Sequence, residues 1–394
     1  MSRLDIRPGV SFVGAIDWER RLFDALIPTP DGTSYNSYLV SGSEKTALID
    51  TVDPSVDFVL VNNLDELKVG RIDYIICNHA EQDHSGSIPI ILDLYPDARV
   101  VCTHRCKDML KDLMHLDEDV FITVNDKENL SLGNRTFEFI YTPWVHWPET
   151  MVTYLKEDNI LFSTDFFGSH LSQSSLYVRD ECQVYESAKR YFGEIMMPFR
   201  TNIQKNLEKL KGYKIDVIAP SHGPLYDKPA FILDAYHSWV YDPPKNIVLL
   251  PYVSMHGSTK AMIDHLVDAL IQRQVEVKQF DLTVTDTGKL AIALVDAATL
   301  VLGTCTVLGG AHPMAANTAF LANALRPNLK FASVIGSYGW ASKAVEQITS
   351  SLTNIKVEVL APVYIKGYPS EENFQALGLL ADTIENKHRD NGFK

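Results

Sequence analysis

Apolar residues in the first 241 positions recur with the periods of both strands and helices. Short apolar runs predict strands at 39–40, 47–50, 72–77, 98–102, 119–124, 136–141, 151–156, 159–163 and 216–219. Helical spacing covers 55–68, 86–95, 105–114 and 182–211, the last interrupted near Met197-Pro198. Because strands follow one another with few helices between them and helices cluster elsewhere, we predict two sheets packed between helices, an αββα sandwich.

The order of predicted strands and helices changes after Tyr241-Asp242-Pro243-Pro244-Lys245, where consecutive prolines cannot continue a helix. Strands are then predicted at 246–253, 274–281, 298–303, 329–336 and 355–360, alternating with helices at 259–272, 287–295, 314–325, 341–352 and 370–387. This alternation predicts a doubly wound, five-stranded parallel sheet. We therefore expect an α/β protein of two domains, residues 1–244 and 245–394.

Composition and charge exclude several classes of protein. The 394 residues carry a net charge of −14, whereas a nucleic-acid surface needs clustered Lys and Arg. The start, Met1-Ser2-Arg3-Leu4-Asp5, lacks the features of a signal peptide. No run approaches the roughly 18 apolar residues of a membrane span. We expect a cytoplasmic protein that binds neither nucleic acid nor membrane.

Five cysteines are scattered along the chain: Cys77, Cys102, Cys106, Cys182 and Cys305. They form no C-x-x-C, so a disulfide framework is not expected. Cys102 and Cys106 flank His104, but the strand and helix patterns there favour a structural role over a metal site. No rubredoxin-type module is expected, so electrons for redox chemistry would come from another protein or a diffusible donor.

The strongest chemical signal is the segment Asn78-His79-Ala80-Glu81-Gln82-Asp83-His84, directly after the apolar run 72–77. Its pattern, H-x-E-x-D-H, places metal-capable side chains at the end of a buried strand, where a rigid scaffold often presents chemistry. Zinc hydrolases built on this kind of loop carry His in place of Glu81. A carboxylate there makes the site harder and more anionic, which favours iron or manganese over zinc.

Three later positions supply further ligand types, each near the end of a predicted strand. His146 lies in the aromatic turn Trp144-Val145-His146-Trp147-Pro148, Asp165 follows the strand 159–163, and His222 follows the strand 216–219. With the first loop they provide the ligands that a two-metal site requires.

The series His79, Glu81, Asp83, His146, Asp165 and His222 resembles the diiron site of flavodiiron proteins, which lies on a metallo-β-lactamase-like domain. The resemblance implies that His79, Glu81 and His146 bind one iron. It implies that Asp83 and His222 bind the other and that Asp165 bridges the two. The three carboxylates would offset most of the +4 charge of two ferrous ions.

Three more residues match positions around the family's site. His84 either stays outside the ligand set or exchanges with His79 as a ligand, and we expect it outside. Asp50 matches a residue that supports the metal loop by hydrogen bonds, although a simple turn residue explains it nearly as well. His170 matches a pocket histidine to which proton delivery can be ascribed.

A loop in the C-terminal half indicates a flavin. The strand 249–253 is followed by Ser254-Met255-His256-Gly257-Ser258-Thr259 and then a helix, so hydroxyls and backbone N–H groups form an anion cradle. The sequence has no G-K-[ST] there, which excludes a P-loop. The loop resembles the FMN-phosphate loop of flavodoxins, which implies Ser254, Ser258 and Thr259 as phosphate ligands.

Two further loops follow later strands at the same sheet edge, where parallel sheets bind ligands. They contain the candidate FMN contacts Thr304, Cys305, Thr306, Ser337, Tyr338, Gly339 and Trp340. Tyr338 or Trp340 is expected to stack on the isoalloxazine. Flavodiiron proteins usually have Pro-Thr where this chain has Cys305-Thr306, which alters the ring contacts and flavin potential. The resemblance covers essentially the whole chain, and no additional C-terminal redox module is expected.

The resemblance implies an oxidoreductase that reduces O2 to water, NO to N2O, or both, with FMN passing electrons to a diiron site. The expected external donor is a rubredoxin-like protein or reduced coenzyme F420. Because flavodiiron proteins set the FMN of one chain against the irons of another, we expect a head-to-tail homodimer or a dimer of dimers. Trp147 either lines that contact or packs in the core.

Other readings of the same residues are open. A zinc or manganese hydrolase of the metallo-β-lactamase superfamily would use this scaffold, but Glu81 and the flavin loops argue against it. An electron carrier or redox sensor with a vestigial metal site is disfavoured by the complete ligand set. Within the family, no residue singles out an F420H2 oxidase, and the preference between O2 and NO is open too.

Overall fold

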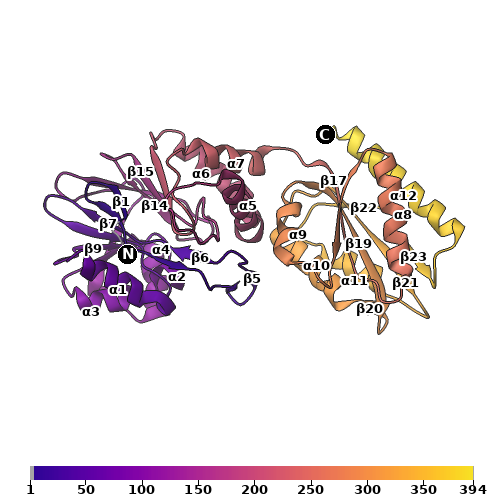
Figure 1. The fold of residues 1–394 in the computed structure, drawn as a ribbon, viewed down its shortest axis with the longest axis horizontal. Coiled ribbons are helices and arrows are strands. Elements are labelled where there is room, and N and C mark those ends of the chain that lie inside the picture. The colour runs from indigo at the N-terminus through magenta and orange to yellow at the C-terminus, as the bar shows by residue number, and fades with distance from the viewer. Residues whose placement is uncertain (1–3, 394) are drawn as a thin grey trace. The chain divides into compact units, whose positions relative to one another are not determined.

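The computed structural model describes residues 4–393, and the chain divides into two compact units (Figure 1). The first contains the residues up to Tyr191 together with Phe199–Val240, and the second contains the residues from Tyr241 onward together with Phe192–Pro198. The main division therefore lies beside the proline pair that the sequence marks as a linker. No helix among the described residues is long and apolar enough to cross a membrane.

The first unit contains a seven-stranded sheet in the order β1-β2-β7-β8-β9-β10-β11. Its strands are β1 Leu4–Arg7, β2 Val10–Phe12, β7 Tyr38–Ser41, β8 Thr46–Ile49, β9 Tyr74–Ile76, β10 Arg99–Thr103 and β11 Phe121–Val124. From β8 to β11 neighbouring strands are parallel. Residues that follow β8 and β9 therefore emerge at the same edge, which brings Asp50 beside the metal loop.

A second, five-stranded sheet has the order β12-β13-β14-β15-β16. Its strands are β12 Asn129–Ser131, β13 Thr136–Tyr141, β14 Met151–Leu155, β15 Ile160–Thr164 and β16 Val217–Pro220. The pairs are antiparallel except for β15 and β16, which run parallel. Asp165 and His222 thus follow adjacent strands at one edge.

Strand periodicity explains how these two sheets pack. Ile75 and Val100 belong to a core shared with helices on the outer face of the first sheet. Their neighbours Ile76 and Val101 point the other way and pack against the second sheet, as side chains alternate along a strand. The outer helices are α1 Asp57–Glu66, α3 Ile88–Leu94 and α4 His104–Met114. The predicted αββα sandwich is confirmed.

The second unit is a parallel sheet in the order β18-β17-β19-β21-β22. Its parallel strands are β17 Lys245–Tyr252, β18 Glu276–Asp281, β19 Ala297–Val307, β21 Phe331–Tyr338, β22 Glu358–Val359 and β23 Val363–Lys366, and the short β20 Gly310–Ala311 pairs antiparallel with the end of β19. Its helices are α8 Ser258–Gln272, α9 Thr287–Leu294, α10 Pro313–Leu325, α11 Ala344–Ser351 and α12 Glu371–Asp390. In Figure 1, α8 and α12 lie on one face and α9, α10 and α11 on the other. This is the flavodoxin-like arrangement that the sequence predicts.

The last strand of the second unit differs from the sequence-based expectation. The fifth strand is not continuous over 355–360, because β22 ends at Val359 and β23 resumes at Val363, both pairing with β21. Pro362 separates the two pieces and has no N–H to donate. The sheet edge therefore continues to Lys366.

The helical run predicted for 182–211 is broken where the sequence suggests. It consists of α5 Glu181–Tyr191, a π-helical turn at Phe192–Met196, a 3-10 turn at Met197–Phe199 and α6 Arg200–Leu210. Sequence analysis missed β1, β2 and β12 of the two sheets, the shorter strands β3 Ala15–Asp17, β4 Leu22–Phe23, β5 Ile27–Pro28, β6 Thr33–Tyr35 and β20 Gly310–Ala311, and two helices, α2 Gln82–Ser85 and α7 Ala230–Tyr241. Strands of two to four residues carry too little periodicity to be recognised.

Candidate metal centre and flavin site

The H-x-E-x-D-H segment continues from β9 into a single helical turn. His79 lies in the loop, Glu81 precedes α2, and Asp83 and His84 are within α2. His79, Asp83 and His84 are almost fully buried. One short segment thus aims several polar side chains into the interior.

Asp50 anchors the start of this segment. Its Oδ1 accepts the backbone N–H of Asn78 at 2.8 Å, and its Oδ2 accepts the Asn78 amide Nδ2 at 3.0 Å. Asn78 in turn accepts the Thr153 hydroxyl at 2.7 Å and the Met151 N–H at 3.1 Å from β14. Asp50 therefore supports the loop rather than contacting the candidate ligands, and it ties one sheet to the other.

Four candidate ligands form the first cluster: His79, Glu81, His146 and Asp165. Asp165 Oδ2 lies 3.3 Å from His79 Nε2 and 3.1 Å from His146 Nε2. Glu81 Oε2 lies 3.1 Å and 3.2 Å from the same two nitrogens. Two imidazole nitrogens and two carboxylate oxygens thus surround one small space.

The other oxygen of Asp165 faces a second cluster, which consists of Asp83, His84 and His222. Asp165 Oδ1 lies 3.0 Å from His84 Nε2 and 3.4 Å from His222 Nε2. Asp83 Oδ2 lies 3.3 Å and 3.0 Å from those nitrogens. Asp165 therefore stands between the clusters, and His84 occupies a place equivalent to that of His222.

Several of these close atoms make no hydrogen bond. Both carboxylate oxygens of Asp83, both ring nitrogens of His84 and Asp165 Oδ1 are buried without a hydrogen-bond partner among the described residues. Buried polar groups in proteins are normally paired, and orphaned ones call for an explanation. Nitrogens and oxygens that lie close yet point past one another are what a shared cation would leave, so the donor set fits two metal ions.

Carboxylates also perturb the histidines of the metal-free chain. Burial alone would lower the pKa values of His146 and His222, but the contacts with Asp165 and with Glu81 or Asp83 raise them to about 9 and about 10. A metal ion bound here would displace those protons.

Glu149 is a buried neighbour of the centre that sequence analysis missed. Its Oε1 lies 2.7 Å from His79 Nδ1 and accepts the Ala80 N–H at 3.0 Å. The His222 ring turns its Nδ1 instead to the backbone carbonyl of Ser34, at 2.7 Å. The available signal was the carboxylate three residues after His146, in a turn already marked by Trp147-Pro148.

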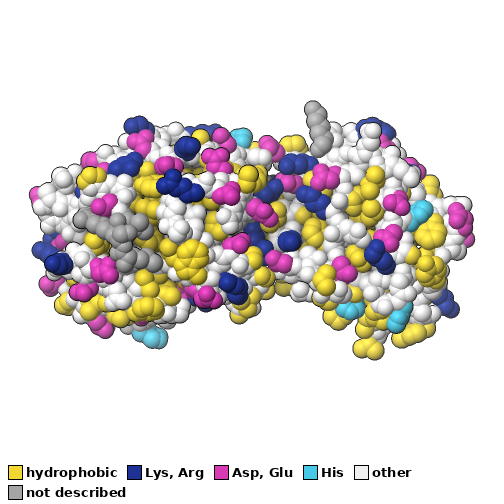
Figure 2. All heavy atoms as spheres, viewed as in Figure 1, with side chains coloured by type: hydrophobic (Ala, Val, Ile, Leu, Met, Phe, Trp, Pro, Cys, Tyr) yellow, Lys and Arg dark blue, Asp and Glu magenta, His cyan; other side chains and the backbone are white. Residues whose placement is uncertain are grey.

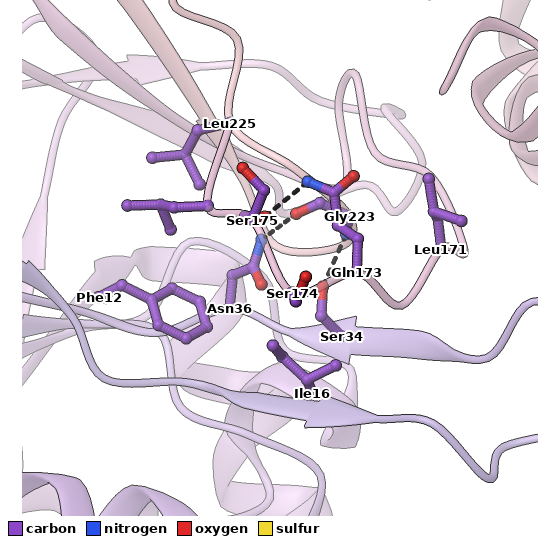
Figure 3. Close-up of a pocket in the computed structure, with 11 residues that line it drawn as sticks. Phe12, Ile16, Ser34, Asn36, Leu171, Gln173, Ser174, Ser175, Gly223 and Leu225 are labelled. Atoms are coloured by element: carbon purple, nitrogen blue, oxygen red, sulfur yellow. Dashed lines mark hydrogen bonds between the residues drawn. The ribbon is translucent and has the colours of Figure 1, made fainter. Parts of the chain in front are cut away.

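Hydrogen bonds with Ser34 and Asn36 hold the loop that carries His222 in place. Asn36 Nδ2 donates to the carbonyls of Pro220 and Gly223, both at 2.8 Å, and the Gly223 N–H donates to Ser34 Oγ at 2.8 Å. Ser34, Asn36 and Gly223 border a small hollow together with Gln173, shown in Figure 3. Its volume of about 20 Å³ is the scale of a single water molecule, so it is no substrate pocket.

Two other side chains flank the centre. His170 Nδ1 lies 2.9 Å from Thr33 Oγ1, and its ring centroid lies 5.0 Å from that of His222. Burial, with help from His222, lowers the pKa of His170 well below its ordinary value, so the ring is neutral. Asp24, which sequence analysis did not single out, has its pKa raised to about 6 by partial burial and by the nearby Glu81 and Asp83 carboxylates.

Trp147 packs between His79 and the hydrophobic core of the first unit. Its ring centroid lies 4.9 Å from that of His79, edge to face, and its side chain contacts the core beneath the first sheet. Trp144, three residues earlier, is 44% exposed and lies parallel to Phe199 at 6.3 Å. Of the two readings given for Trp147, packing in the core is the one that these contacts support.

The second unit has a cavity of about 210 Å³ at the carboxyl edge of its sheet. The predicted contacts that line it are Ser254, Met255, His256, Ser258, Thr259, Cys305, Thr306, Ser337, Tyr338 and Gly339. Gly367, which sequence analysis did not name, also lines it, whereas Gly257, Thr304 and Trp340 are absent from the lining. Three loops far apart in sequence therefore meet at one cavity.

The interior of this cavity suits a phosphorylated aromatic ligand. The Thr259 hydroxyl is buried without a hydrogen-bond partner among the described residues, at the N-terminus of α8. Gly257 has a φ of +87°, a left-handed conformation that turns backbone amides toward an anion. Thr306 Oγ1 is 2.7 Å from the Tyr364 hydroxyl, and the Tyr338 and Tyr364 rings lie nearly parallel. These features fit the phosphate and ring of FMN.

Large apolar side chains near the cavity stay in contact with solvent. Met255, Leu308, Trp340 and Tyr368 are 52%, 97%, 77% and 68% exposed. Figure 2 shows acidic and basic side chains interspersed over the face drawn. The flavin site is thus open where the metal centre is enclosed.

Comparisons with known proteins agree with this arrangement of two domains. Residues 33–223 match the model of the ODP family of β-lactamase-like domains. The chain is 36% identical to a nitric oxide reductase of Moorella thermoacetica over 90% of this chain and 91% of the relative. It is 32% identical to the anaerobic nitric oxide reductase flavorubredoxin of Escherichia coli O1:K1, over 93% of this chain and 78% of that protein.

Solved structures with both units are similar along the whole chain. The rubredoxin oxygen:oxidoreductase of Desulfovibrio gigas matches with a TM-score of 0.94 at 28% identity, over 99% of each chain. The flavodiiron protein of Giardia intestinalis matches with a TM-score of 0.89 at 28% identity, over 98% of each chain. The fold and the paired sites define an oxidoreductase that joins a β-lactamase-like metal domain to a flavodoxin-like domain. The chain belongs to the flavodiiron protein family.

Proposed function

We propose that this protein reduces O2 to water, NO to N2O, or both, at a non-haem diiron centre supplied with electrons through FMN. The observation that carries the proposal is the convergence of two ligand clusters on the two oxygens of Asp165. The relatives support it, since they include a nitric oxide reductase and a rubredoxin oxygen:oxidoreductase.

His79, Glu81 and His146 would hold one iron, Asp83 and His222 the other, and Asp165 would bridge them. We add His84 to the second set, because its Nε2 lies beside the same two carboxylates as that of His222. This differs from the expectation that His84 stays outside the ligand set. Two ferrous ions bound there would supply the electrons for reducing a diatomic gas. Bound FMN would supply the electrons that return the irons to the ferrous state.

The chain's own residues would limit the access of water to the metal ions and would deliver protons to the substrate. Glu81 and the two Asp carboxylates balance the metal charge, and burial excludes bulk water from the bridging side. Asp24 and His170 lie beside the centre and are the groups we propose for delivering the protons that both reductions consume.

The partners follow from the same assignment. We propose that FMN is held by the Ser254–Thr259 loop with Thr306 and Tyr338, and that a rubredoxin-like protein or reduced F420 reduces it. A head-to-tail homodimer, or a dimer of dimers, in the cytoplasm would set the exposed flavin edge against the metal centre of another copy. The exposed Leu308 and Trp340 suit such a contact.

Turnover of the anaerobically reduced protein with each gas tests the proposal. Metal analysis comes first and should give two irons and one FMN per chain. Rapid O2 consumption to water with slow NO turnover would make the protein an oxygen reductase, and the reverse ranking a nitric oxide reductase. Zinc in place of iron, with hydrolysis of a thioester or lactam, would instead establish the metallo-hydrolase alternative. Loaded cofactors with neither gas consumed would refute the proposed activity.

A further inference from the structure

The two ends of the metal centre are braced by groups of different charge. On the first side, His79 Nδ1 lies 2.7 Å from the Glu149 carboxylate. On the second side, His222 Nδ1 donates to the neutral Ser34 carbonyl, and His84 Nδ1 is buried with no hydrogen-bond partner among the described residues. Among these three imidazoles, only that of His79 has a carboxylate at its Nδ1 among the described residues.

Glu149 is nearly as buried as His79, the candidate ligand that it contacts, and it makes hydrogen bonds of its own. It is 2% exposed, and His79 is fully buried. The Ala80 N–H donates to the same carboxylate oxygen at 3.0 Å, and the Thr103 hydroxyl donates to the Glu149 backbone carbonyl at 3.0 Å. Both bonds to the carboxylate go to Oε1 and keep that oxygen against the imidazole, whereas Oε2 is buried without a hydrogen-bond partner among the described residues.

A carboxylate behind a metal-bound imidazole has two effects. It fixes the ring orientation and the tautomer, so that Nε2 presents its lone pair to the metal, and it raises the basicity of that nitrogen. A backbone carbonyl orients a ring too, but it brings no net charge. The buried negative charge of Glu149 therefore adds cation attraction on the first side alone.

We propose that Glu149 is a positioning residue that makes the His79, Glu81 and His146 position the tighter of the two metal positions, so that a first metal ion fills it before the second. The inference rests on the proposed metal-binding role of these residues. It assigns the unequal affinity to a residue that supplies no ligand atom.

Equilibrium binding of Co²⁺ to the chelator-treated protein, measured against a competing chelator, tests this. His222→Ala should weaken metal binding at the second position, so Co²⁺ binding to this variant reports mainly on the first position. His146→Ala should weaken metal binding at the first position, so Co²⁺ binding to that variant reports mainly on the second. In the His222→Ala background, Glu149→Gln should weaken Co²⁺ binding about 10- to 100-fold. In the His146→Ala background the same change should alter it less than about threefold.

Three comparisons keep the result interpretable. Gln can still accept the His79 N–H, so Glu149→Gln isolates charge, whereas Glu149→Ala removes orientation as well and should cost more. Glu157→Gln, a matched change at a carboxylate that accepts the Thr136 N–H at 2.7 Å on the other sheet, should leave both affinities unchanged. Retained FMN and an unchanged circular dichroism spectrum would show that each variant is folded.

Equal weakening in both backgrounds, or none in the His222→Ala background, would overturn the inference while leaving the diiron proposal standing. Failure of the unmodified protein to bind Co²⁺ or iron at all would overturn both.

Discussion

The two halves of this molecule build their sites by opposite means. The candidate metal centre draws side chains from the loop after β9, from α2 and from the turns after β13, β15 and β16, and it buries all of them except the half-buried Glu81 and His146. The flavin site lies at the carboxyl edge of one parallel sheet, where backbone amides, small hydroxyls and partly exposed aromatic rings face a cavity. One site depends on charge held in the interior, and the other depends on backbone geometry at the surface.

The histidines show the consequence of that difference. In the first half, carboxylates raise the pKa values of His146 and His222 against the effect of burial. In the second half, His388 is buried between Thr299 and Asn246, with no carboxylate partner in the part of the chain that the structure describes, and burial lowers its pKa to about 4. Buried histidines that face carboxylates are poised to exchange protons for metal, whereas His388 is a neutral part of the core.

The largest expected effect comes from removing the residue shared by both clusters. Asp165→Ala should abolish stoichiometric iron binding, because it removes one oxygen from each cluster and leaves the surrounding imidazoles without their common carboxylate. FMN should remain bound at about one per chain. Iron analysis and flavin absorbance on the purified variant check both outcomes, and retention of two irons would contradict the site.

The complementary change affects the flavin half. Ser258→Ala combined with Thr259→Ala removes two hydroxyls at the N-terminus of α8, and each hydrogen bond to a charged phosphate contributes about 1.5–3 kcal/mol. FMN binding should weaken about 100-fold or more, while two irons stay bound. Fluorescence titration of the apoprotein with FMN measures the loss. Asp165→Ala is the control, and a shared loss of both cofactors in either variant would end the view that the sites are independent.

A third change tests the support of the metal loop rather than its ligands. Asp50→Ala leaves two buried Asn78 donors without their acceptor, which should cost about 2–4 kcal/mol of stability in the first half. Asp50→Asn keeps one acceptor and should cost less. Urea unfolding followed by tryptophan fluorescence gives the ranking. If the two variants are equally stable, Asp50 is the simple turn residue of the alternative reading.

The smallest effect concerns pH and the second half. The unfolded chain protonates a histidine near pH 6.5, whereas folded His388 does so near pH 4, so unfolding takes up a proton between these values. The contribution of neutral His388 to the free energy of unfolding of this half is therefore fully present above about pH 7. That free energy should fall by up to about 3 kcal/mol as the pH drops to 4. Hydrogen exchange in β17 and α12 measures it. His388→Gln should flatten the profile, and an unchanged slope would assign the effect to other groups.

Much of the fold was predictable because its determinants are local. Alternating strands and helices after the proline pair indicate a parallel sheet, and the apolar runs of β9, β10 and β15 are visible as patterns in the chain. The hairpins before Tyr35 were missed because two- or three-residue strands carry almost no period. The interruption between β22 and β23 was missed because pairing with β21, rather than local sequence, determines where that strand runs.

Part of the metal centre was predictable for a similar reason. Their positions near predicted strand ends and the resemblance to flavodiiron proteins pointed to His79, Glu81, Asp83, His146, Asp165 and His222, and the structure brings these side chains together in two clusters around Asp165. The positions of His84 and Glu149 were not predictable in this way. Whether His84 faces the centre depends on the one-turn helix α2, and Glu149 meets His79 across 70 residues of sequence.

The sequence alone thus determined the order of elements, the two kinds of site and the chemistry of their side chains, since these are properties of local patterns. The tertiary structure decided which oxygen of Asp165 faces which cluster, that His84 lies in the second one, and that the buried Glu149 carboxylate meets His79 Nδ1. Directions and distances between residues far apart in the chain exist only once both sheets are packed. Charge acts over those distances, and so the electrostatic balance between the two clusters of side chains is a property of the folded molecule.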